Sequence, residues 1–432
     1  MAGSWVDIPA DSDFSLANIP FGIVSTPNDP SSHAAVAIGT SILDLKVLFT
    51  SSASPFLTTQ IIPSLAGHEH VFAQPTLNAF AELGRAVHRE VRAGIQALIA
   101  ADTSHPDVLR DNAPLREAAL LPQRAVTLHL PMSIGDYTDF YAGYHHAYAV
   151  GVMFRGPANA LQPNYTHLPV GYHGRASSIV VSGTPVRRPV GQILLDEKPV
   201  TAPSRRLDFE LELGCFISRA NAQGTSVAVD EADKEFIFGY VLLNDWSARD
   251  IQAWEYVPLG PFNSKNFAST ISPWVVLADA LEPFRAAAIP NSTPLQGYLQ
   301  EPKDKKSVFD IKLEVDLTTP ESDTTTVCRT SSRNLLWSFP QMIAHHTLGG
   351  CPLRAGDLLG SGTISGPDAS ERGSLLELSE GGKKDVLLYG MDARTFLKDG
   401  DTVTLRGYCA DGNGARVGFG ECRGRIYGPS SN

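Results

Sequence analysis

The chain has 432 residues, of which 43% are hydrophobic and 19% charged, so it is long enough for two domains and too apolar for a disordered protein. Its formal net charge of −11 is spread along the sequence, which argues against nucleic-acid and anionic-membrane partners. The 37 glycines and 30 prolines predict many turns and therefore short strands.

Cysteine usage and the first residues bear on the compartment. Five cysteines occur without a CxxC pair, which favours a reducing compartment over a disulfide framework or a cysteine-based zinc site. The opening residues, MAGSWVDIP, lack the basic start and apolar core of a signal peptide. No apolar run approaches the roughly 20 residues of a membrane span. We therefore expect a cytoplasmic protein with neither a membrane nor a nucleic-acid partner.

The first hundred residues mix short apolar runs with Pro and Gly breaks, and then contain a predicted helix from about Asn78 to Ala101. The stretch from Ala101 to Gln123 is polar, contains three prolines and is interpreted as a linker. We place the domain boundary there, so the expected domains span residues 1–123 and 124–432. The residues at helical spacing in the helix are Leu77, Phe80, Ala81, Leu83, Gly84, Val87, Val91, Ile95 and Leu98.

Beyond residue 124, short apolar or alternating runs predict strands, separated by turn-forming pairs such as Ser182-Gly183, Asp399-Gly400 and Asp411-Gly412. This pattern is typical of a large sandwich or rolled sheet and not of alternating βαβ units. The expected fold class is therefore mainly β, of the α+β type. The predicted strands are Ala125–Leu130, Ser178–Val181, Leu207–Phe216, Phe238–Leu243, Trp274–Leu277, Phe309–Val315, Leu375–Leu378 and Val403–Tyr408.

The predicted strand at residues 207–213 alternates apolar residues with three acids, Asp208, Glu210 and Glu212. Taken alone, it is well explained as a half-buried strand with a solvated acidic face. The alternative is a metal site, because Glu210 and Glu212 lie on one face about 6.6 Å apart, at about 3.3 Å per residue. Neighbouring like charges disfavour each other unless a cation lies between them, and carboxylates suit Ca²⁺ or Mg²⁺.

Further oxygen ligands can come from two segments that mix acids with aromatic residues. They contain Asp139 and Asp245, and each of these residues, taken alone, is better explained as a turn or cap residue. Two histidine pairs, at 145–146 and at 345–346, offer a general base, and composition does not rank one pair above the other. A neutral imidazole takes a proton from water near pH 7 when a carboxylate orients its other nitrogen.

Polar and cationic donors cluster in two later segments, residues 246–252 and 262–267. Their side chains suit a substrate carboxylate or a developing oxyanion. The glycine-rich tract at 360–366 also offers backbone donors, although a plain turn explains it equally well. It lacks the lysine of a phosphate-binding P-loop, so we do not expect nucleotide binding. The tract at 171–175 is loop-like and can also line a site.

Four strings resemble the fumarylacetoacetate hydrolase family: IGDYTDFY (134–141), LPVGYHGRASSIVVSGTPVRRP (168–189), LNDWSARDIQAWEYVPLGPF (243–262) and SGTISG (361–366). The resemblance covers most of the chain and is strongest from about residue 128. It implies an N-terminal SH3-like barrel followed by a large mixed β-roll that carries the catalytic site. It also implies a homodimer.

The same resemblance implies a metal centre with Ca²⁺, or Mg²⁺, at the catalytic site. A second, structural Mg²⁺ is implied near Asp245, Lys265 and Ser269, where Ser269 replaces the threonine of other family members. The ligands implied for the catalytic ion are Asp139, Glu210, Glu212 and Asp245.

Catalytic and substrate-binding roles follow from the resemblance as well. His146 is implied as the base and Glu377 as the carboxylate that orients it. Arg249, Gln252 and Lys265 are implied as donors to the oxyanion. The implied substrate contacts are Tyr141, Arg155, Tyr172, Gln252, Tyr256 and Thr363.

The implied reaction is the hydrolysis of a carbon–carbon bond in the diketo acid 4-fumarylacetoacetate. The products are fumarate and acetoacetate, and this is the last step of tyrosine and phenylalanine breakdown. One alternative is an acylpyruvate hydrolase or a decarboxylase of the same fold. The other is a non-enzymatic Ca²⁺-binding β-module, which would have no need of the pair formed by His146 and Glu377.

Overall fold

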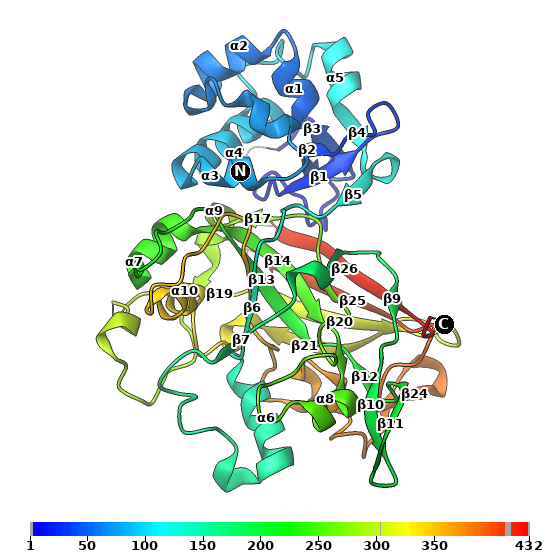
Figure 1. Cartoon of the computed structure of the whole chain (residues 1–432). Helices are drawn as coiled ribbons and strands as arrows, with labels where there is room; N and C mark the ends of the chain where they lie inside the picture. Colours follow the sequence, from blue (N-terminus) through cyan, green and yellow to red (C-terminus); the bar gives the residue numbers. More distant parts are fainter. Residues whose placement is uncertain (1–2, 303, 411–415, 431–432) are drawn as a thin grey trace.

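The computed structural model describes residues 3–302, 304–410 and 416–430. The chain forms a smaller N-terminal region, drawn in blue and cyan in Figure 1, and a larger region beneath it. Helices and strands are mixed in both regions, and curled sheets dominate the larger one. The predicted mainly β character is therefore confirmed.

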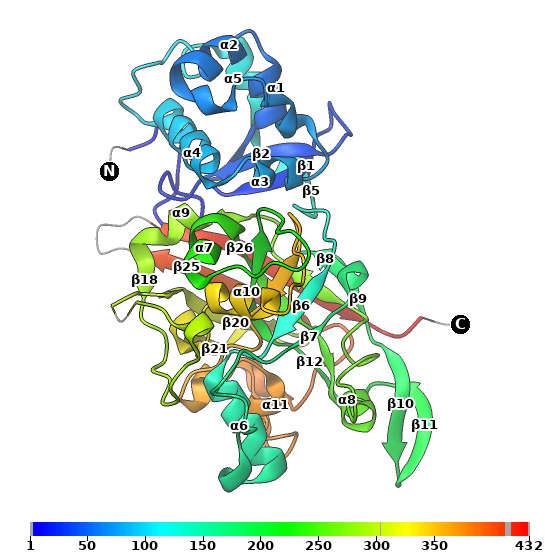
Figure 2. The ribbon, with the colours of Figure 1, turned by 60° about the vertical axis from the view of Figure 1, so that its left-hand side comes forward.

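The N-terminal region is built on an antiparallel sheet of five strands in the order β4-β3-β2-β1-β5. Several helices lie on the side of this sheet that faces away from the larger region, whereas those that carry Phe80 and His88 reach the larger region and pack against Phe238 (Figures 1 and 2). The strands are β1 (Phe21–Ser25), β2 (His33–Ile38), β3 (Ser41–Asp44), β4 (Leu120–Pro122) and β5 (Thr127–His129). The helices are α1 (Leu45–Thr50), α2 (Ser54–Phe56), α3 (Asn78–Glu82), α4 (Arg85–Ile99) and α5 (Ala113–Ala119).

Two local predictions for this region need correction. The single helix predicted from Asn78 is broken in two, because Gly84 adopts φ 85° and separates α3 from α4. The stretch interpreted as a linker contains α5, which Asn112 caps at its start, and β4, which pairs with β3. Since β5 pairs with β1, the sheet takes strands from both sides of residue 123. The boundary at 123/124 stays a prediction.

An eight-stranded sheet forms the centre of the larger region, in the order β7-β6-β22-β13-β14-β16-β8, with β17 paired to β14. Both faces of β14 are buried: Val241 and Leu243 join the core shared with the N-terminal region, and Tyr240 and Leu242 join the main core. The strands are β6 (Tyr137–Phe140), β7 (Gly171–His173), β8 (Ile179–Val181), β13 (Leu211–Ile217), β14 (Ile237–Asp245), β16 (Ser269–Ile271), β17 (Val276–Leu277) and β22 (Leu358–Gly360).

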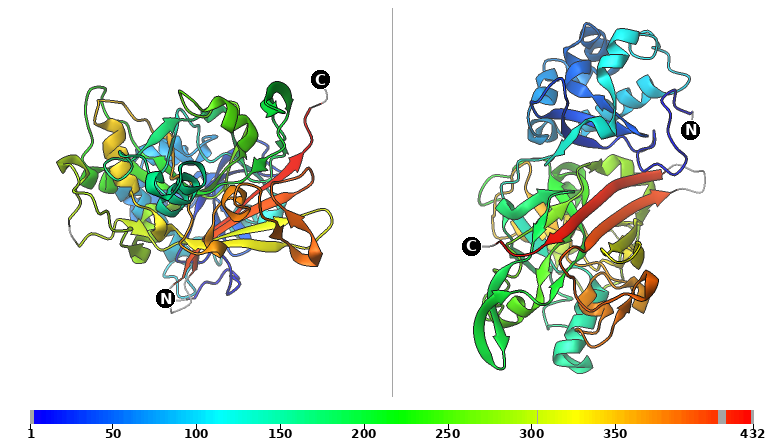
Figure 3. Two further views of the ribbon diagram at one scale, coloured as in Figure 1. Left: turned by 90° about the horizontal axis from the view of Figure 1, so that it is seen from below. Right: turned by 90° about the vertical axis from the view of Figure 1, so that its right-hand side faces the viewer.

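A second sheet, in the order β21-β20-β25-β26-β9, packs against the first and closes the main core. Its two longest strands, β25 and β26, run side by side below the N-terminal region in the right-hand view of Figure 3. The strands are β9 (Val186–Arg187), β20 (Lys312–Thr318), β21 (Thr325–Ser331), β25 (Thr402–Ala410) and β26 (Arg416–Tyr427).

Short strand pairs and helices complete the larger region, and the β10–β11 hairpin projects from its lower end in Figure 2. The paired strands are β10 (Val190–Leu195) with β11 (Lys198–Pro203), β12 (Leu207–Asp208) with β15 (Ser247–Ala248), β18 (Arg285–Ala286) with β19 (Val308–Phe309), and β23 (Val386–Leu387) with β24 (Ala393–Arg394). The helices are α6 (Tyr144–Arg155), α7 (Val229–Glu231), α8 (Arg249–Glu255), α9 (Ala278–Leu281), α10 (Phe339–Thr347) and α11 (Leu375–Leu378).

Three sequence-based predictions in this region have different outcomes. The strand predicted at Leu375–Leu378 is wrong: it is the one-turn helix α11, and the Ser374 side chain accepts a hydrogen bond from its backbone. The turns at Gly183 and Gly400 are confirmed, with φ 91° and 94°. The turn predicted at Asp411-Gly412 lies outside the described residues.

The acidic strand is also different from its simplest interpretation. It is interrupted between β12 and β13, where the backbone N–H of Phe209 donates to the Asp208 side chain. Asp208, Glu210 and Glu212 are 0%, 5% and 0% exposed, so the solvated acidic face is wrong. Burial of three carboxylates requires partners, and these partners define the site.

Candidate active site

Three carboxylates from three strands meet inside the larger region. Asp139 lies on β6, Glu212 on β13 and Asp245 at the end of β14, and one oxygen from each lies within 4.8 Å of the others. Strand β22 runs between β6 and β13 and places Gly360 opposite Asp139. A Cβ at Gly360 would lie 2.8 Å from Asp139 Oδ1 and 3.1 Å from Glu212 Oε2, so a glycine is needed for the carboxylates to meet.

The charges of this triad are poorly compensated by the protein. Asp139 Oδ1 and Glu212 Oε1 are buried without a hydrogen-bond partner, although Glu212 Oε2 accepts the Gly362 N–H at 3.0 Å. Burial, and then repulsion by neighbouring carboxylates, raises the pKa of Asp139 and of Glu212 well above the usual range. Two orphaned oxygens in a cluster of hard donors fit a divalent cation such as Ca²⁺ or Mg²⁺.

Lys265 and Ser269 contact the triad at Asp245. The Lys265 ammonium donates to Asp245 and to Glu210, and the Ser269 hydroxyl donates to Asp245 Oδ1 at 2.8 Å. Burial opposes the charged form of Lys265, but Asp245 and Glu210 outweigh it and raise the lysine pKa. Lys265 is therefore a fixed cation beside the triad.

Glu210 differs from the triad because two cations already compensate it. Arg249 Nη2 lies 2.8 Å from Glu210 Oε1, and Lys265 contacts the other oxygen. Burial would raise the pKa of Glu210, but Lys265 and Arg249 outweigh that effect and lower it. Glu210 is thus close to the site, with both oxygens engaged by side chains of the protein.

His146 and Glu377 form a buried pair on the other side of Glu210. His146 Nδ1 lies 2.6 Å from Glu377 Oε2, and His146 Nε2 lies 4.0 Å from Glu210 Oε1. Burial would raise the pKa of Glu377, yet His146 and hydrogen bonds from Ser374 and Ser365 outweigh it and lower the pKa. An ionised Glu377 accepts from Nδ1 and leaves Nε2 free to accept a proton.

The structure separates the histidines that composition left unranked. His146 is buried, whereas its neighbour His145 is only half-buried and stacks edge-on against Tyr144. In the other pair, His345 contacts the Tyr298 hydroxyl and His346 contacts the Thr138 hydroxyl. The carboxylate pairing thus belongs to His146.

Some of the predicted substrate contacts lie close to these groups. The Tyr141 ring packs edge-on against His146 at 5.5 Å, and the Tyr172 hydroxyl lies 3.5 Å from Asp245 Oδ2. Thr363 is buried in the tract that follows β22. Gln252 on α8 accepts from Arg249 Nη1 at 3.2 Å.

Two other predicted contacts are turned to solvent. Arg155, at the end of α6, is exposed and donates to the backbone carbonyls of Asn159 and Ala160. Tyr256, just after α8, is 52% exposed. The structure therefore does not bring these two side chains to the triad.

Sequence reasoning missed three residues that hold the pair and the cations. Ser365 and Ser374 both donate to Glu377 Oε2, and Asp208 accepts from Arg249 and from the backbone of α11. The SGTISG string contains Ser365 and was the signal for it. Ser374 caps the short helix that carries Glu377, and Asp208 acts through partners far away in the sequence, so neither role has a sequence motif.

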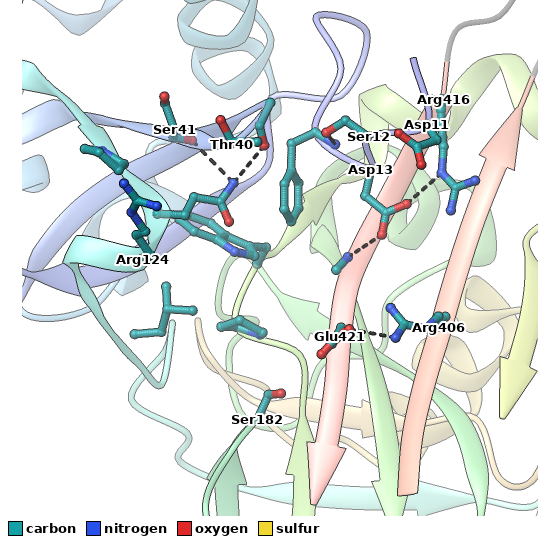
Figure 4. Close-up of a pocket in the computed structure, with 18 residues that line it drawn as sticks. Asp11, Ser12, Asp13, Thr40, Ser41, Arg124, Ser182, Arg406, Arg416 and Glu421 are labelled. Atoms are coloured by element: carbon teal, nitrogen blue, oxygen red, sulfur yellow. Dashed lines mark hydrogen bonds and ion pairs between the residues drawn. The ribbon is translucent and has the colours of Figure 1, made fainter. Parts of the chain in front are cut away.

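Two cavities differ in their chemistry. A small one of about 60 Å³ reaches the site and is lined by Tyr172, Asp245, Lys265 and Ser269, among others. A larger one of about 1070 Å³ lies between the two regions (Figure 4). Its charged lining is mostly internally paired, as between Arg416 and Asp13 and between Arg406 and Glu421. The small cavity is therefore the candidate active-site cavity, because residues of the site line it.

Comparison with known proteins places this chain in a family. The profile described as fumarylacetoacetate (FAA) hydrolase C-terminal matches residues 137–427, and the one described as fumarylacetoacetase N-terminal matches residues 17–131. The chain belongs to the fumarylacetoacetate hydrolase family. The named alternative of a non-enzymatic β-module is therefore not favoured.

Relatives in sequence support this membership, and a solved structure shows the same fold. The chain is 57% identical over 430 residues to a fumarylacetoacetase of Aspergillus fumigatus, and 48% identical over 432 residues to that of Homo sapiens, with 98% of each chain covered in both cases. It also shares the fold of a fumarylacetoacetate hydrolase from Exiguobacterium antarcticum, with a TM-score of 0.50, 15% identity, and 95% and 99% of the two chains covered.

A search of the described residues for membrane-spanning helices was negative. No helix there is both long enough and apolar enough to cross a bilayer.

Proposed function

We propose that this chain hydrolyses the carbon–carbon bond of 4-fumarylacetoacetate to give fumarate and acetoacetate, as in tyrosine and phenylalanine breakdown. The observation that carries the proposal is the pairing of His146 with Glu377 beside the carboxylate triad, in a chain related over its full length to fumarylacetoacetases. An acylpyruvate hydrolase or decarboxylase is not favoured, because relatives at 45–57% identity carry the name fumarylacetoacetase.

His146 is the proposed general base. Its Nδ1 proton is held by Glu377, so Nε2 accepts a proton from water while the water oxygen attacks the ketone carbon next to the fumaroyl group. A carboxylate partner stabilises the imidazolium that forms, as Glu377 can do here. The water oxygen becomes part of the fumarate product.

Arg249, Gln252 and Lys265 are the proposed donors to the oxyanion that develops on the attacked carbonyl. An ammonium group has three N–H donors, and Glu210 and Asp245 engage two of those of Lys265. One donor remains for the substrate, and such a donor typically contributes about 3–4 kcal/mol. Collapse of the tetrahedral centre breaks the carbon–carbon bond, and the acetoacetate carbon that leaves with the electron pair takes up a proton.

We propose that Asp139, Glu210, Glu212 and Asp245 together hold Ca²⁺, or Mg²⁺, at this site. The all-oxygen donor set and the orphaned oxygens of Asp139 and Glu212 support such an ion. When bound, the ion would supply positive charge to the acetoacetyl oxygens of the substrate. A second Mg²⁺ is proposed near Lys265, Asp245 and Ser269, and the contact of the Ser269 hydroxyl with Asp245 supports it.

The remaining substrate contacts are proposed as a shell around the reacting atoms. The position of Tyr141 beside His146, and that of Tyr172 beside Asp245, support contact with the two ends of the substrate. Thr363 is proposed to contact substrate from the SGTISG tract. Arg155 and Tyr256 are proposed to turn inward when substrate binds, since both side chains are exposed.

The finer architectural expectations are also proposals. The five-stranded N-terminal sheet supports an SH3-like barrel, and the two packed sheets of the larger region support a catalytic β-roll. Five free cysteines support a cytoplasmic location. The homodimer rests on the family resemblance alone.

The test is a substrate comparison with the purified protein. We expect rapid loss of 4-fumarylacetoacetate with equimolar release of fumarate and acetoacetate, and little turnover of an acylpyruvate or of oxaloacetate. A chelator should abolish activity, and Ca²⁺ or Mg²⁺ should restore it. Faster turnover of either comparison substrate would replace the proposed reaction with the alternative one.

A further inference from the structure

Asp208 is a buried carboxylate for which no role was implied by the family resemblance. It is 0% exposed and accepts four hydrogen bonds. Its Oδ2 accepts from Arg249 Nε at 2.9 Å and from the Leu376 N–H at 2.9 Å. Its Oδ1 accepts from the Leu375 N–H at 2.7 Å and from the Phe209 N–H at 2.8 Å. Four donors occupy the acceptor positions of a carboxylate, so both oxygens of Asp208 are fully hydrogen-bonded within the protein.

The Asp208 side chain connects two parts of the site that are distant in sequence. Leu375 and Leu376 begin α11, and the next residue is Glu377, which orients His146. Arg249 contacts Gln252 and Glu210 with its remaining nitrogens. One side chain therefore holds both the helix that carries the orienting carboxylate and a proposed oxyanion donor.

Helix α11 needs such an anchor because it is only four residues long. A single turn is not stable by itself, since nucleation of a helix is unfavourable. Its position must be set by contacts from outside the turn, and the two backbone N–H groups held by Asp208 are among those contacts. A small movement of α11 would displace Glu377 and with it the His146 ring.

We propose that Asp208 is a positioning residue that fixes Glu377 and Arg249 relative to each other. It acts through both partners and supplies no proton, charge or contact to the substrate. Misplacement of reacting groups by about 1 Å can lower a rate about 100-fold, so the geometric effect is large enough to measure. The inference rests on the proposed hydrolysis for its readout.

The test is a double-mutant cycle. Asp208→Asn replaces one acceptor oxygen with an N–H₂ group, so at least one of the four donors loses its partner. We expect kcat to fall about 10–100-fold with KM changed by less than about 3-fold. In a Glu377→Gln background, where orientation of His146 is already impaired, the same substitution should lower kcat by less than it does in the wild type, because only the part that acts through Arg249 remains.

Asp401 provides a matched control. It is also 0% exposed, and it accepts from Arg394 Nε and Nη2 at 2.9 Å and from the Lys398 N–H at 2.8 Å, none of which belongs to the site. Asp401→Asn should lower the melting temperature as Asp208→Asn does, while leaving kcat of the folded protein nearly unchanged and its small effects additive with Glu377→Gln. If Asp208→Asn does not fold, Asp208→Glu, which keeps the charge, enters the same cycle.

The outcomes separate this inference from the proposed reaction. Wild-type protein that fails to release fumarate contradicts the reaction itself. With an active wild type, additive effects of Asp208→Asn and Glu377→Gln would show that Asp208 does not position Glu377, and an equal fall in kcat for Asp401→Asn would show that it is only a stabilising buried group. Either result would overturn the positioning role.

Discussion

The N-terminal region and the larger region differ in how completely their buried titratable groups are paired or neutral. In the N-terminal region, His33 is paired with Asp44 at 2.8 Å. His88 lies among aromatic side chains, and burial lowers its pKa to about 4, so its ring is neutral. In the larger region, Asp139 and Glu212 keep oxygens that no group of the protein satisfies.

This difference indicates that the N-terminal region supports the structure, whereas the larger region carries the candidate site. Phe80 and His88 of the N-terminal region pack against Phe238 on β14, and Asp245 lies at the end of the same strand. The N-terminal region thus supports one face of the sheet whose strands carry the carboxylates. A well-packed support lets the larger region retain unfavourable buried charges, as functional sites often do.

The largest expected effect is on the base. His146→Ala should lower kcat about 100- to 10,000-fold, because general-base catalysis contributes about that much. Metal affinity should stay near the wild-type value, since His146 contacts Glu377 and is no member of the triad, whereas the melting temperature should fall because the buried Glu377 carboxylate loses this partner. Steady-state kinetics measures kcat, and calorimetry measures metal affinity and melting temperature. His145→Ala is the matched control and should retain turnover, and full activity of His146→Ala would remove this residue from the mechanism.

The next largest effect concerns the unsatisfied charges. Glu212→Gln keeps the shape of the side chain and the acceptor for the Gly362 N–H while it removes one charge of the triad. We expect the variant to bind Ca²⁺ at least about 10-fold more weakly and to be more stable than the wild type when both are free of metal. In the wild type, ion at 100 times its Kd should stabilise the fold by about 2.7 kcal/mol. Thermal unfolding with and without Ca²⁺ measures both effects.

Glu210→Gln sharpens the comparison within the site. Glu210 is already compensated by Lys265 and Arg249, so its removal leaves both cations without this partner. We expect weaker Ca²⁺ binding, as for Glu212→Gln, but a metal-free protein that is less stable than the wild type. A gain in metal-free stability would show that Glu210 belongs with the uncompensated carboxylates, and unchanged Ca²⁺ affinity would remove it from the proposed ligands.

The sequence predicted the strand that carries Glu212 and the strand Phe238–Leu243 that ends just before Asp245, because both follow from apolar runs of the right length. It could not show that the acids are buried. Alternation describes which residues share a face, and burial of that face depends on β22 and on Gly360, about 150 residues further along the chain. Tertiary neighbours therefore decided between a solvated face and a site.

Local pattern also failed where the backbone is held by side chains from elsewhere. Leu375–Leu378 has the composition of a short buried strand, yet Ser374 and Asp208 hold its first N–H groups and make it a helical turn. The helix predicted across Leu83 and Gly84 failed for a different reason, since φ at Gly84 lies in the left-handed region. Both cases depend on contacts or dihedral angles that periodicity does not encode.

The prediction with the smallest expected effect on the site itself concerns the neutral histidine of the N-terminal region. The pKa of His88 is about 4 in the folded protein and 6.5 without burial, because burial disfavours the charged ring. Below pH 6.5 the unfolded chain takes up a proton that the folded protein takes up only near pH 4. Stability is therefore intact above pH 6.5 and decreases as pH falls to 4, by about 3 kcal/mol in total for this group.

His88→Gln isolates this contribution from that of the carboxylates that titrate over the same range. The variant loses packing against Phe80 and Phe238 at every pH, but it has no proton to take up. The difference in unfolding free energy between wild type and variant should thus be largest at pH 7.5 and shrink toward pH 4. A constant difference for His88→Gln would mean that this region does not keep its buried histidine neutral, and the contrast with the carboxylate triad would fail.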